Sequence, residues 1–156
     1  MQYQWLSHSV EQTQQWAAAF AGQCLRHCPA SGLIVTLEGE LGAGKTALSQ
    51  GLIRSLLPNA RVKSPTFSLL ESYELHVCSI HHLDLYRLQD TEELEYLGLR
   101  DLFWHNLCLI EWASKGKGWL PVADIAIAME YEASSRCIQL QSQTENGHAI
   151  LQALMS

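Results

Sequence analysis

Residues 39–46 read Gly-Glu-Leu-Gly-Ala-Gly-Lys-Thr, the pattern G-x-x-x-x-G-K-[ST] of a phosphate-binding loop. The preceding residues 33–37 form a short apolar run rich in β-branched side chains, as expected of a strand buried on both faces. The apolar residues of 47–57 recur at helical spacing until Pro58 and Asn59 end the pattern. The motif therefore has the strand–loop–helix context that nucleotide binding requires.

The residue types in this loop suit phosphate chemically. Glycines let successive backbone N–H groups curl around phosphate oxygens, and the helix that follows directs its positive end at the same point. The lysine can reach the β- and γ-phosphates, and the threonine hydroxyl can ligate Mg²⁺. The expected nucleotide-binding residues of the loop are Leu41, Gly42, Ala43, Gly44, Lys45 and Thr46, with Lys45 also expected to be catalytic.

Length and composition indicate one domain over residues 1–156, a single P-loop nucleotide-binding unit. Hydrophobic content of 47% and charged content of 17% are typical of globular proteins, and no apolar stretch approaches the length of a membrane span. The first thirty residues carry polar and acidic groups where a secretory signal would be basic and then apolar. We expect a cytoplasmic protein with no membrane partner.

The five cysteines are odd in number and scattered, which argues for a reducing compartment and against a disulfide framework. Cys24 and Cys28 stand one helical turn apart, but no second Cys/His pair has zinc-finger spacing. Along a strand, alternation would place the histidines and cysteine of residues 76–82 on opposite faces. We therefore expect no zinc.

The net charge of −6 argues against a protein that grips nucleic acid alone. The ten Lys and Arg residues are dispersed, and the only local cluster, Lys115 and Lys117, is flanked by glycine as in a solvated turn.

The remaining pattern predicts an α/β fold with a mixed parallel and antiparallel central sheet, in a P-loop NTPase-like three-layer arrangement flanked by helices. A helix capped by Ser7 or Ser9 should run to about Leu25, with Val10 among its inward residues. Thr91 looks like a second helix cap, with Leu94, Leu97 and Leu99 facing inward. Strands are expected at 3–6, 68–74, 78–85, 107–110, 125–129 and 136–141, with a hairpin joining 68–74 to 78–85 and a final helix at 147–154.

Two acids are candidates for catalysis and for the metal. Glu111 follows four apolar residues, so it should lie at the carboxyl end of a buried strand, where open α/β sheets bind ligands. Asp84 ends another candidate strand, whose neighbouring residues look too polar for full burial. One of the pair would hold Mg²⁺ and the other would position or deprotonate water, and spacing does not decide which. Trp112 adjoins Glu111 and should report on the site.

Ser64-Pro65-Thr66 follows the loop helix and admits two interpretations. It can be an ordinary turn, because proline restricts Ser64 and the hydroxyls can cap locally. It can also be a switch that senses the γ-phosphate, because many P-loop proteins have one at this position.

The ordered motifs at 39–46, 63–67, 82–87, 93–98, 109–112 and 120–121 resemble the TsaE (YjeE) family over nearly the whole chain. Leu83 stands where phenylalanine is common, and Glu40 stands where aspartate is common; both keep the polarity class. The resemblance implies a small bacterial ATPase that binds ATP or ADP with Mg²⁺ and takes part in the threonylcarbamoyl modification of adenosine 37 of tRNA.

The resemblance further implies that this ATPase resets the TsaB–TsaD complex between turnovers and meets tRNA only through that complex. It matches Lys45 and Thr46 to phosphate and Mg²⁺ binding, Asp84 and Glu111 to the acidic residues of the site, and Thr66 to the switch segment. It also places nucleotide contacts near Thr13 and Arg136.

Two other functions remain open. A small-molecule P-loop kinase is possible, although the dispersed arginines supply no obvious lid. A module that binds ATP with incidental hydrolysis is also possible. A GTPase is excluded because the chain has no N-K-x-D tetrad and no glycine three residues after Asp84.

Overall fold

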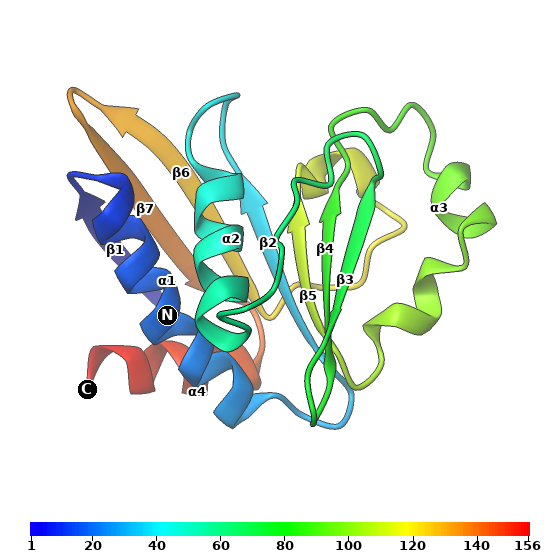
Figure 1. Ribbon diagram of the computed structural model, residues 1–156, viewed down its shortest axis with the longest axis horizontal. Coiled ribbons are helices and arrows are strands. Elements are labelled where there is room, and N and C mark those ends of the chain that lie inside the picture. The colour runs from blue at the N-terminus through cyan, green and yellow to red at the C-terminus, as the bar shows by residue number, and fades with distance from the viewer.

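One seven-stranded sheet, with strand order β1-β7-β6-β2-β5-β4-β3, forms the centre of the computed structural model, which describes residues 1–156 (Figure 1). The strands are β1 (Gln2–Ser7), β2 (Leu33–Glu38), β3 (Leu70–Glu74), β4 (Ser79–Asp84), β5 (Leu107–Glu111), β6 (Ile125–Glu132) and β7 (Ser135–Ser142). The helices are α1 (Val10–His27), α2 (Lys45–Leu56), α3 (Glu92–Tyr96) and α4 (Glu145–Met155), with 3₁₀ turns η1 (Leu99–Phe103) and η2 (Ala113–Gly116).

The sheet is mixed, as the sequence predicts. β2 pairs in parallel with β5 and β6, and β4 pairs in parallel with β5. β3 and β4 form the expected antiparallel hairpin, and β7 pairs antiparallel with both β1 and β6. The parallel centre brings the carboxyl ends of β2, β4 and β5 to one edge of the sheet.

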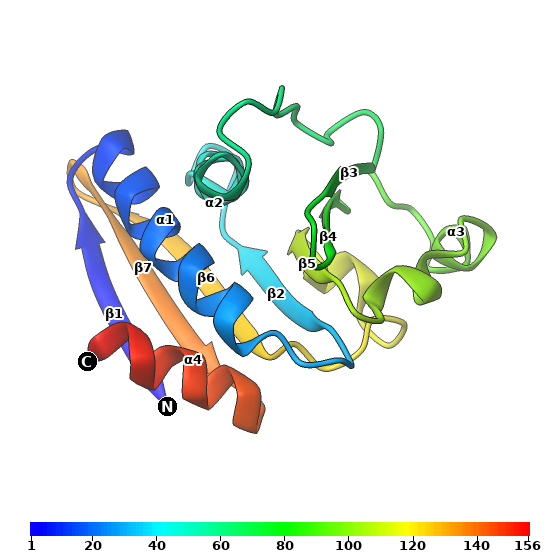
Figure 2. The same ribbon diagram turned by 60° about the horizontal axis from the view of Figure 1, so that its bottom comes forward.

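Side-chain alternation along the central strands divides the core in two. On β5, Leu107 and Leu109 belong to one apolar cluster, and Cys108 and Ile110 belong to the other. α1, α2 and α4 cover the face of the first cluster, and Figure 2 shows α1 lying across β7 and β6. Side chains on β5 are therefore buried whichever face they point to.

The second face is covered only in part. Residues from α3, η1 and the segment around Trp119 pack over β4 and β5 and complete the second cluster. On the other half of that face Gln139 and Gln141 of β7 are exposed beside the alanines of β6. The three-layer arrangement thus applies to the β5–β4 half of the sheet.

The region after Thr91 differs from the expectation. α3 has only five residues, and Thr91 makes no side-chain cap. The Glu93 carboxylate instead accepts the backbone N–H groups of Gln89 and Asp90, each at 3.0 Å. Leu94 and Leu99 are buried as predicted, but Leu97 is 56% exposed, because Gly98 turns left-handed (φ 64°) and ends the helical spacing.

Two further expectations were wrong. Val10, expected on the inner face of α1, is 41% exposed, because it is the first helical residue after the Ser9 cap and lies ahead of the packed turns. β4 was expected to be too polar for full burial, yet His81 and His82 are 6% and 0% exposed. Each histidine has a polar partner, Ser72 for His81 and Glu111 for His82, which offsets the cost of burying the ring.

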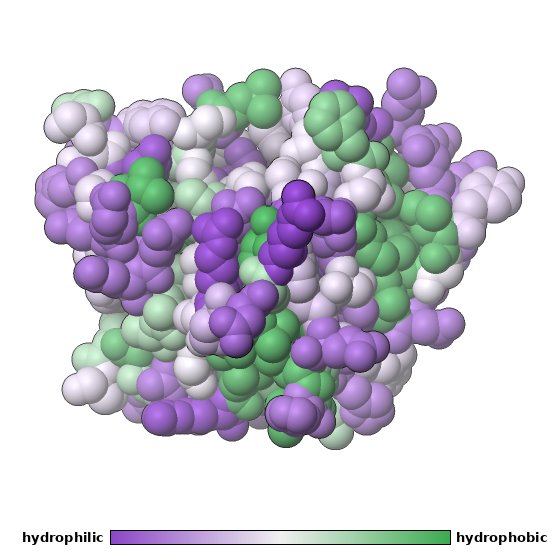
Figure 3. All heavy atoms as spheres, in the orientation of Figure 1, coloured by the Kyte–Doolittle hydropathy of each residue, from purple (hydrophilic) through white to green (hydrophobic).

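None of the helices combines the length and apolar character that a membrane crossing needs. In Figure 3 hydrophilic and hydrophobic residues are interspersed over the visible face of the molecule.

Candidate functional site

The phosphate-loop sequence joins the end of β2 to the start of α2. Gly39, Gly42 and Gly44 have φ values of 151°, 80° and 107°, conformations that side-chain-bearing residues rarely adopt. A Cβ on Gly39 would lie 2.4 Å from the Met129 carbonyl oxygen, so β6 leaves room only for glycine there. Backbone geometry by itself therefore requires glycine at these positions of the motif.

Lys45, the first residue of α2, folds back over the loop. Its ammonium donates to the carbonyls of Gly39 and of Glu40, the latter at 2.9 Å, and lies 4.3 Å from the centre of the Trp112 ring. Burial lowers the pKa of Lys45, while the carboxylates of Glu111, Glu38 and Asp84 act in the opposite direction. The site thus holds a partly desolvated ammonium beside several acids.

The two candidate acids meet because of strand register. Asp84 ends β4 and Glu111 ends β5, and the register of this parallel pair sets them directly opposite each other. Their side chains point to the face on which α2 lies, and they are 6% and 1% exposed. Two carboxylates that are far apart in the sequence therefore lie beside the start of α2. The sequence predicted that each would lie at the carboxyl end of a strand, the edge where such sheets bind ligands.

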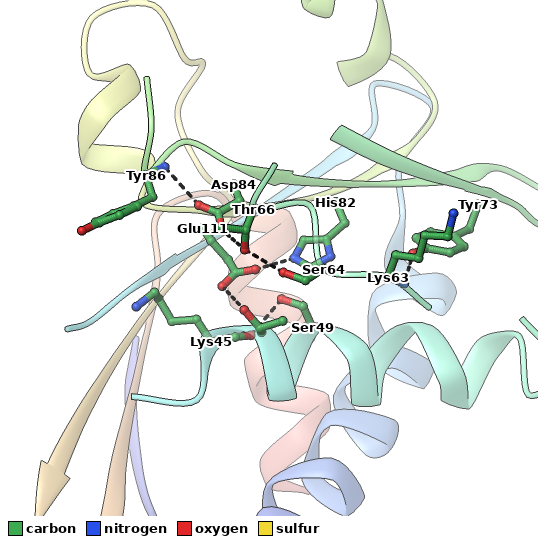
Figure 4. A network of polar contacts seen from close by, with 11 residues as sticks. Lys45, Ser49, Lys63, Ser64, Thr66, Tyr73, His82, Asp84, Tyr86 and Glu111 are labelled. Carbon is green, nitrogen blue, oxygen red and sulfur yellow. Dashed lines mark hydrogen bonds and ion pairs between the residues drawn. The ribbon is translucent and has the colours of Figure 1, made fainter. Parts of the chain in front are cut away.

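The Glu111 carboxylate is held at both oxygens (Figure 4). The Thr46 hydroxyl donates to Oε1 at 2.9 Å, and His82 Nε2 lies 2.6 Å from Oε2. This chain joins α2, β5 and β4. It fixes Glu111 beside the hydroxyl that the motif assigns to the metal.

Asp84 contacts the 64–66 segment, which the sequence allowed to be either an ordinary turn or a switch. The Thr66 hydroxyl donates to Asp84 Oδ2 at 3.4 Å and lies 2.7 Å from the Ser64 hydroxyl, and the Tyr86 N–H donates to Oδ1 at 3.0 Å (Figure 4). The 64–66 segment is therefore a turn whose hydroxyls also reach the acidic site. This geometry is compatible with both interpretations.

A pocket of about 230 Å³ opens between these groups. It brings together the loop, the switch-like segment, the two acids and residues just after β4. Its lining residues are Leu41, Gly42, Gly44, Lys45, Thr46, Ala47, Thr66, Asp84, Tyr86, Arg87, Glu111 and Trp112.

Arg136 borders the loop, and Thr13 lies near it through Ser7. A Cβ on Gly44 would be 3.0 Å from Arg136 Nε, so the guanidinium borders the loop. The Thr13 hydroxyl is buried and lies 2.7 Å from Ser7 Oγ, and Ser7 pairs with Arg136 across β1 and β7. Both residues lie outside the lining of the 230 Å³ pocket.

Sequence reasoning missed His82 and Tyr131. His82 precedes Asp84 by two residues on the same strand, so its side chain shares the face of Asp84, and that spacing could have revealed it. The Tyr131 hydroxyl donates to the Gly42 carbonyl from the tip of the β6–β7 hairpin. No local sequence signal indicates that contact, because it depends on the length and path of the hairpin.

The donor set fits Mg²⁺. Hard cations of this kind take oxygen ligands, and the site offers the Thr46 hydroxyl, the buried Glu111 carboxylate and the buried Asp84 carboxylate. Lys45 lines the same pocket, and its contacts are with carbonyls and the Trp112 ring. The acids therefore have no direct lysine or arginine ion pair that would compete with a metal.

Comparison with known proteins agrees over most of the chain. The family model "Threonylcarbamoyl adenosine biosynthesis protein TsaE" matches residues 7–138. The TsaE protein of Haemophilus influenzae is 47% identical over 122 residues, covering 78% of this chain and 77% of that protein. The Bacillus subtilis protein of the same description is 36% identical over 133 residues, covering 83% and 78%.

The fold agrees as well. The crystal structure of Bacillus subtilis YdiB superposes with a TM-score of 0.78 at 26% identity, covering 99% of this chain and 95% of that one. The sequence motifs, the family model and the relatives all lead to one assignment: the chain belongs to the TsaE family of tRNA threonylcarbamoyladenosine biosynthesis proteins.

Proposed function

We propose that this protein is a Mg²⁺-dependent ATPase whose nucleotide cycle serves the TsaB–TsaD complex in the threonylcarbamoyl modification of tRNA adenosine 37. One observation carries the enzymatic part: a glycine loop with Lys45 and Thr46 stands against two buried carboxylates at paired strand ends. Phosphate-binding groups and acids for metal and water are the parts that phosphoryl transfer to water needs.

The contacts suggest a division of roles that the sequence left open. Thr46 and Glu111, already 2.9 Å apart, would hold Mg²⁺. Asp84, in contact with Thr66, would orient the attacking water. The metal would supply charge neutralisation at the β- and γ-phosphates. Lys45 would exchange its two loop carbonyls for phosphate oxygens, which are stronger acceptors because they are charged.

The partner part of the proposal rests on the family and on charge. The relatives are described as tRNA threonylcarbamoyladenosine biosynthesis proteins, and this chain carries a net charge of −6. An acidic protein has little electrostatic affinity for tRNA by itself. We therefore place its action on the protein complex, with tRNA contacted only through that complex.

Calorimetry with ATP and ADP, with and without Mg²⁺, tests the site. Lys45→Ala should weaken nucleotide binding by about 10-fold or more, because it removes charge-assisted hydrogen bonds worth roughly 1.5–3 kcal/mol. Lys117→Ala, which changes an exposed lysine, is the matched control and should bind as the wild type does. Wild-type affinity in Lys45→Ala would contradict the assignment.

Phosphate release with and without TsaB–TsaD tests the reaction. Asp84→Asn should retain nucleotide affinity and lose hydrolysis, and Glu111→Gln should also lose the Mg²⁺ dependence of binding. Phosphorylation of an added small-molecule acceptor would identify a kinase instead. ATP that stays intact with both partners present would identify a binding module.

A further inference from the structure

His82 is a buried polar residue that the proposed reaction does not use directly. It lies on β4 two residues before Asp84, so both side chains point to the α2 face. Its exposure is 0%, and its strand neighbours on that face include Ile80, a member of the main apolar cluster. A histidine in such surroundings needs a specific partner to offset its burial.

That partner is Glu111 alone. Nε2 of His82 lies 2.6 Å from Oε2 of Glu111, while Nδ1 of the ring is buried and has no hydrogen-bond partner. Only one of the two nitrogens of the His82 ring therefore takes part in a polar interaction. The contact with Glu111 is therefore the one polar interaction through which His82 can act.

The opposite oxygen of Glu111 shows why this contact bears on the site. Oε1 accepts the Thr46 hydroxyl at 2.9 Å, so His82 and Thr46 hold the carboxylate from its two ends (Figure 4). A carboxylate restrained at both oxygens cannot rotate freely about its last torsion. His82 thus helps to fix the orientation of the Glu111 carboxylate plane relative to the first turn of α2.

We propose that His82 is a positioning residue that orients the Glu111 carboxylate for Mg²⁺ binding; this inference rests on the proposed Mg²⁺–nucleotide site. His82 acts through Glu111 and touches neither substrate nor metal. Groups that hydrogen-bond to metal-ligating carboxylates commonly change metal affinity or activity by about 10–100-fold when removed.

Two substitutions separate the hydrogen bond from packing. His82→Phe keeps a planar ring of similar size and removes the donor. His82→Gln places an amide N–H near the position of Nε2 and can still donate to Glu111. His81→Phe is the matched control: it changes the neighbouring buried histidine, whose ring nitrogen Nδ1 lies 2.8 Å from Ser72 Oγ on the other face of β4.

The readout is the ratio of ADP affinity with Mg²⁺ to ADP affinity without it, measured by calorimetry on the full chain. His82→Phe should reduce this ratio by about 10-fold or more while leaving the Mg²⁺-free affinity as in the wild type. His82→Gln should recover the ratio to within about three-fold, and His81→Phe should leave it unchanged. Thermal unfolding of each variant identifies any that do not fold.

Three results would overturn the inference: a wild-type ratio in His82→Phe, an equal loss in His82→Phe and His82→Gln, or an equal loss in His81→Phe. If His82→Phe does not fold, His82→Asn replaces it, because its shorter amide corresponds to Nδ1 and does not reach Glu111. A wild-type protein whose ADP affinity ignores Mg²⁺ would refute the proposed metal site itself. That result is read from the wild type and is distinct from the variant results.

Discussion

At the scale of single residues, the Lys45 side chain is held against its own loop. The ammonium lies against two carbonyls of its own loop and against Trp112. Burial lowers its pKa, and the neighbouring carboxylates limit that effect. In the proposed function a phosphate group would have to outcompete neutral carbonyls for this ammonium, which would favour ligands with high negative charge.

His81 leads to a prediction about pH. Burial lowers the pKa of His81 below its usual value of 6.5, so the unfolded chain takes up this proton at a higher pH than the folded protein does. The stability contribution of the neutral ring is complete above pH 6.5 and is lost as the pH falls below it. The free energy of unfolding should therefore fall between about pH 7.5 and 5.5 by more in the wild type than in His81→Asn.

His81→Asn is chosen because its amide can take the place of Nδ1 beside Ser72 and does not titrate. Urea unfolding of both proteins across this pH range checks the prediction. Parallel pH profiles for the two proteins would show that His81 does not contribute.

The sequence predicted the strand-end positions of the two acids, but it did not predict that His82 contacts Glu111. Glu111 was recognisable because it follows an apolar run, and Asp84 because it ends a strand. His82 looked like a reason to doubt burial of β4, and the structure shows it fully buried against Glu111. A buried polar side chain depends on a partner from another strand, and a single segment of sequence does not contain that partner.

At the scale of elements, apolar periodicity predicted the long segments better than the short ones. α1, α2 and α4 appear near their expected positions, with Ser9 and Thr144 accepting the capping N–H groups of α1 and α4. α3 is a short helix that Gly98 ends, so the inward spacing expected through Leu97 does not continue. A short helix adds little stability of its own, so packing determines its boundaries.

Two helical glycines lead to opposite predictions. Gly22 in α1 has nothing within 4 Å of an added Cβ, so Gly22→Ala should stabilise the protein by about 0.5–1 kcal/mol. A Cβ on Gly147 in α4 would lie 2.0 Å from the Asp124 carbonyl oxygen. Gly147→Ala should therefore destabilise the protein by about 1–3 kcal/mol, because α4 must move away from Asp124.

Chemical denaturation of both variants beside the wild type checks this pair. If both variants are more stable than the wild type, α4 does not approach Asp124 as closely as described. If both variants are less stable than the wild type, the space around Gly22 is not free to accept a Cβ.

At the scale of the whole molecule, uneven coverage of the sheet is the main structural feature. The helices α1, α2 and α4 cover one face of the sheet. The second face is covered only over its β5–β4 half (Figures 1 and 2). The Mg²⁺–nucleotide site proposed above lies where parallel strands of the covered half end. It is therefore supported from both faces of the sheet.

Net charge leads to a prediction for the whole molecule. With a charge of −6, the protein alone should not bind labelled tRNA in fluorescence anisotropy at concentrations up to about 10 µM, within the usual range of non-specific affinity. Addition of TsaB–TsaD should produce binding that this protein and ATP then modulate. Strong binding by the protein alone would contradict the proposed route to tRNA.

The sequence by itself determined the glycine-rich loop between a strand and a helix, the α/β class, the mixed sheet and the strand ends that carry Asp84 and Glu111. These features depend on local periodicity, turn chemistry and short-range spacing, which one segment contains. Only the tertiary structure decided that Glu111 lies between Thr46 and His82, that Tyr131 reaches Gly42, and that half of one sheet face stays open. Those features depend on strand register and on contacts between residues far apart in the chain, and local pattern does not encode the partner of a buried group.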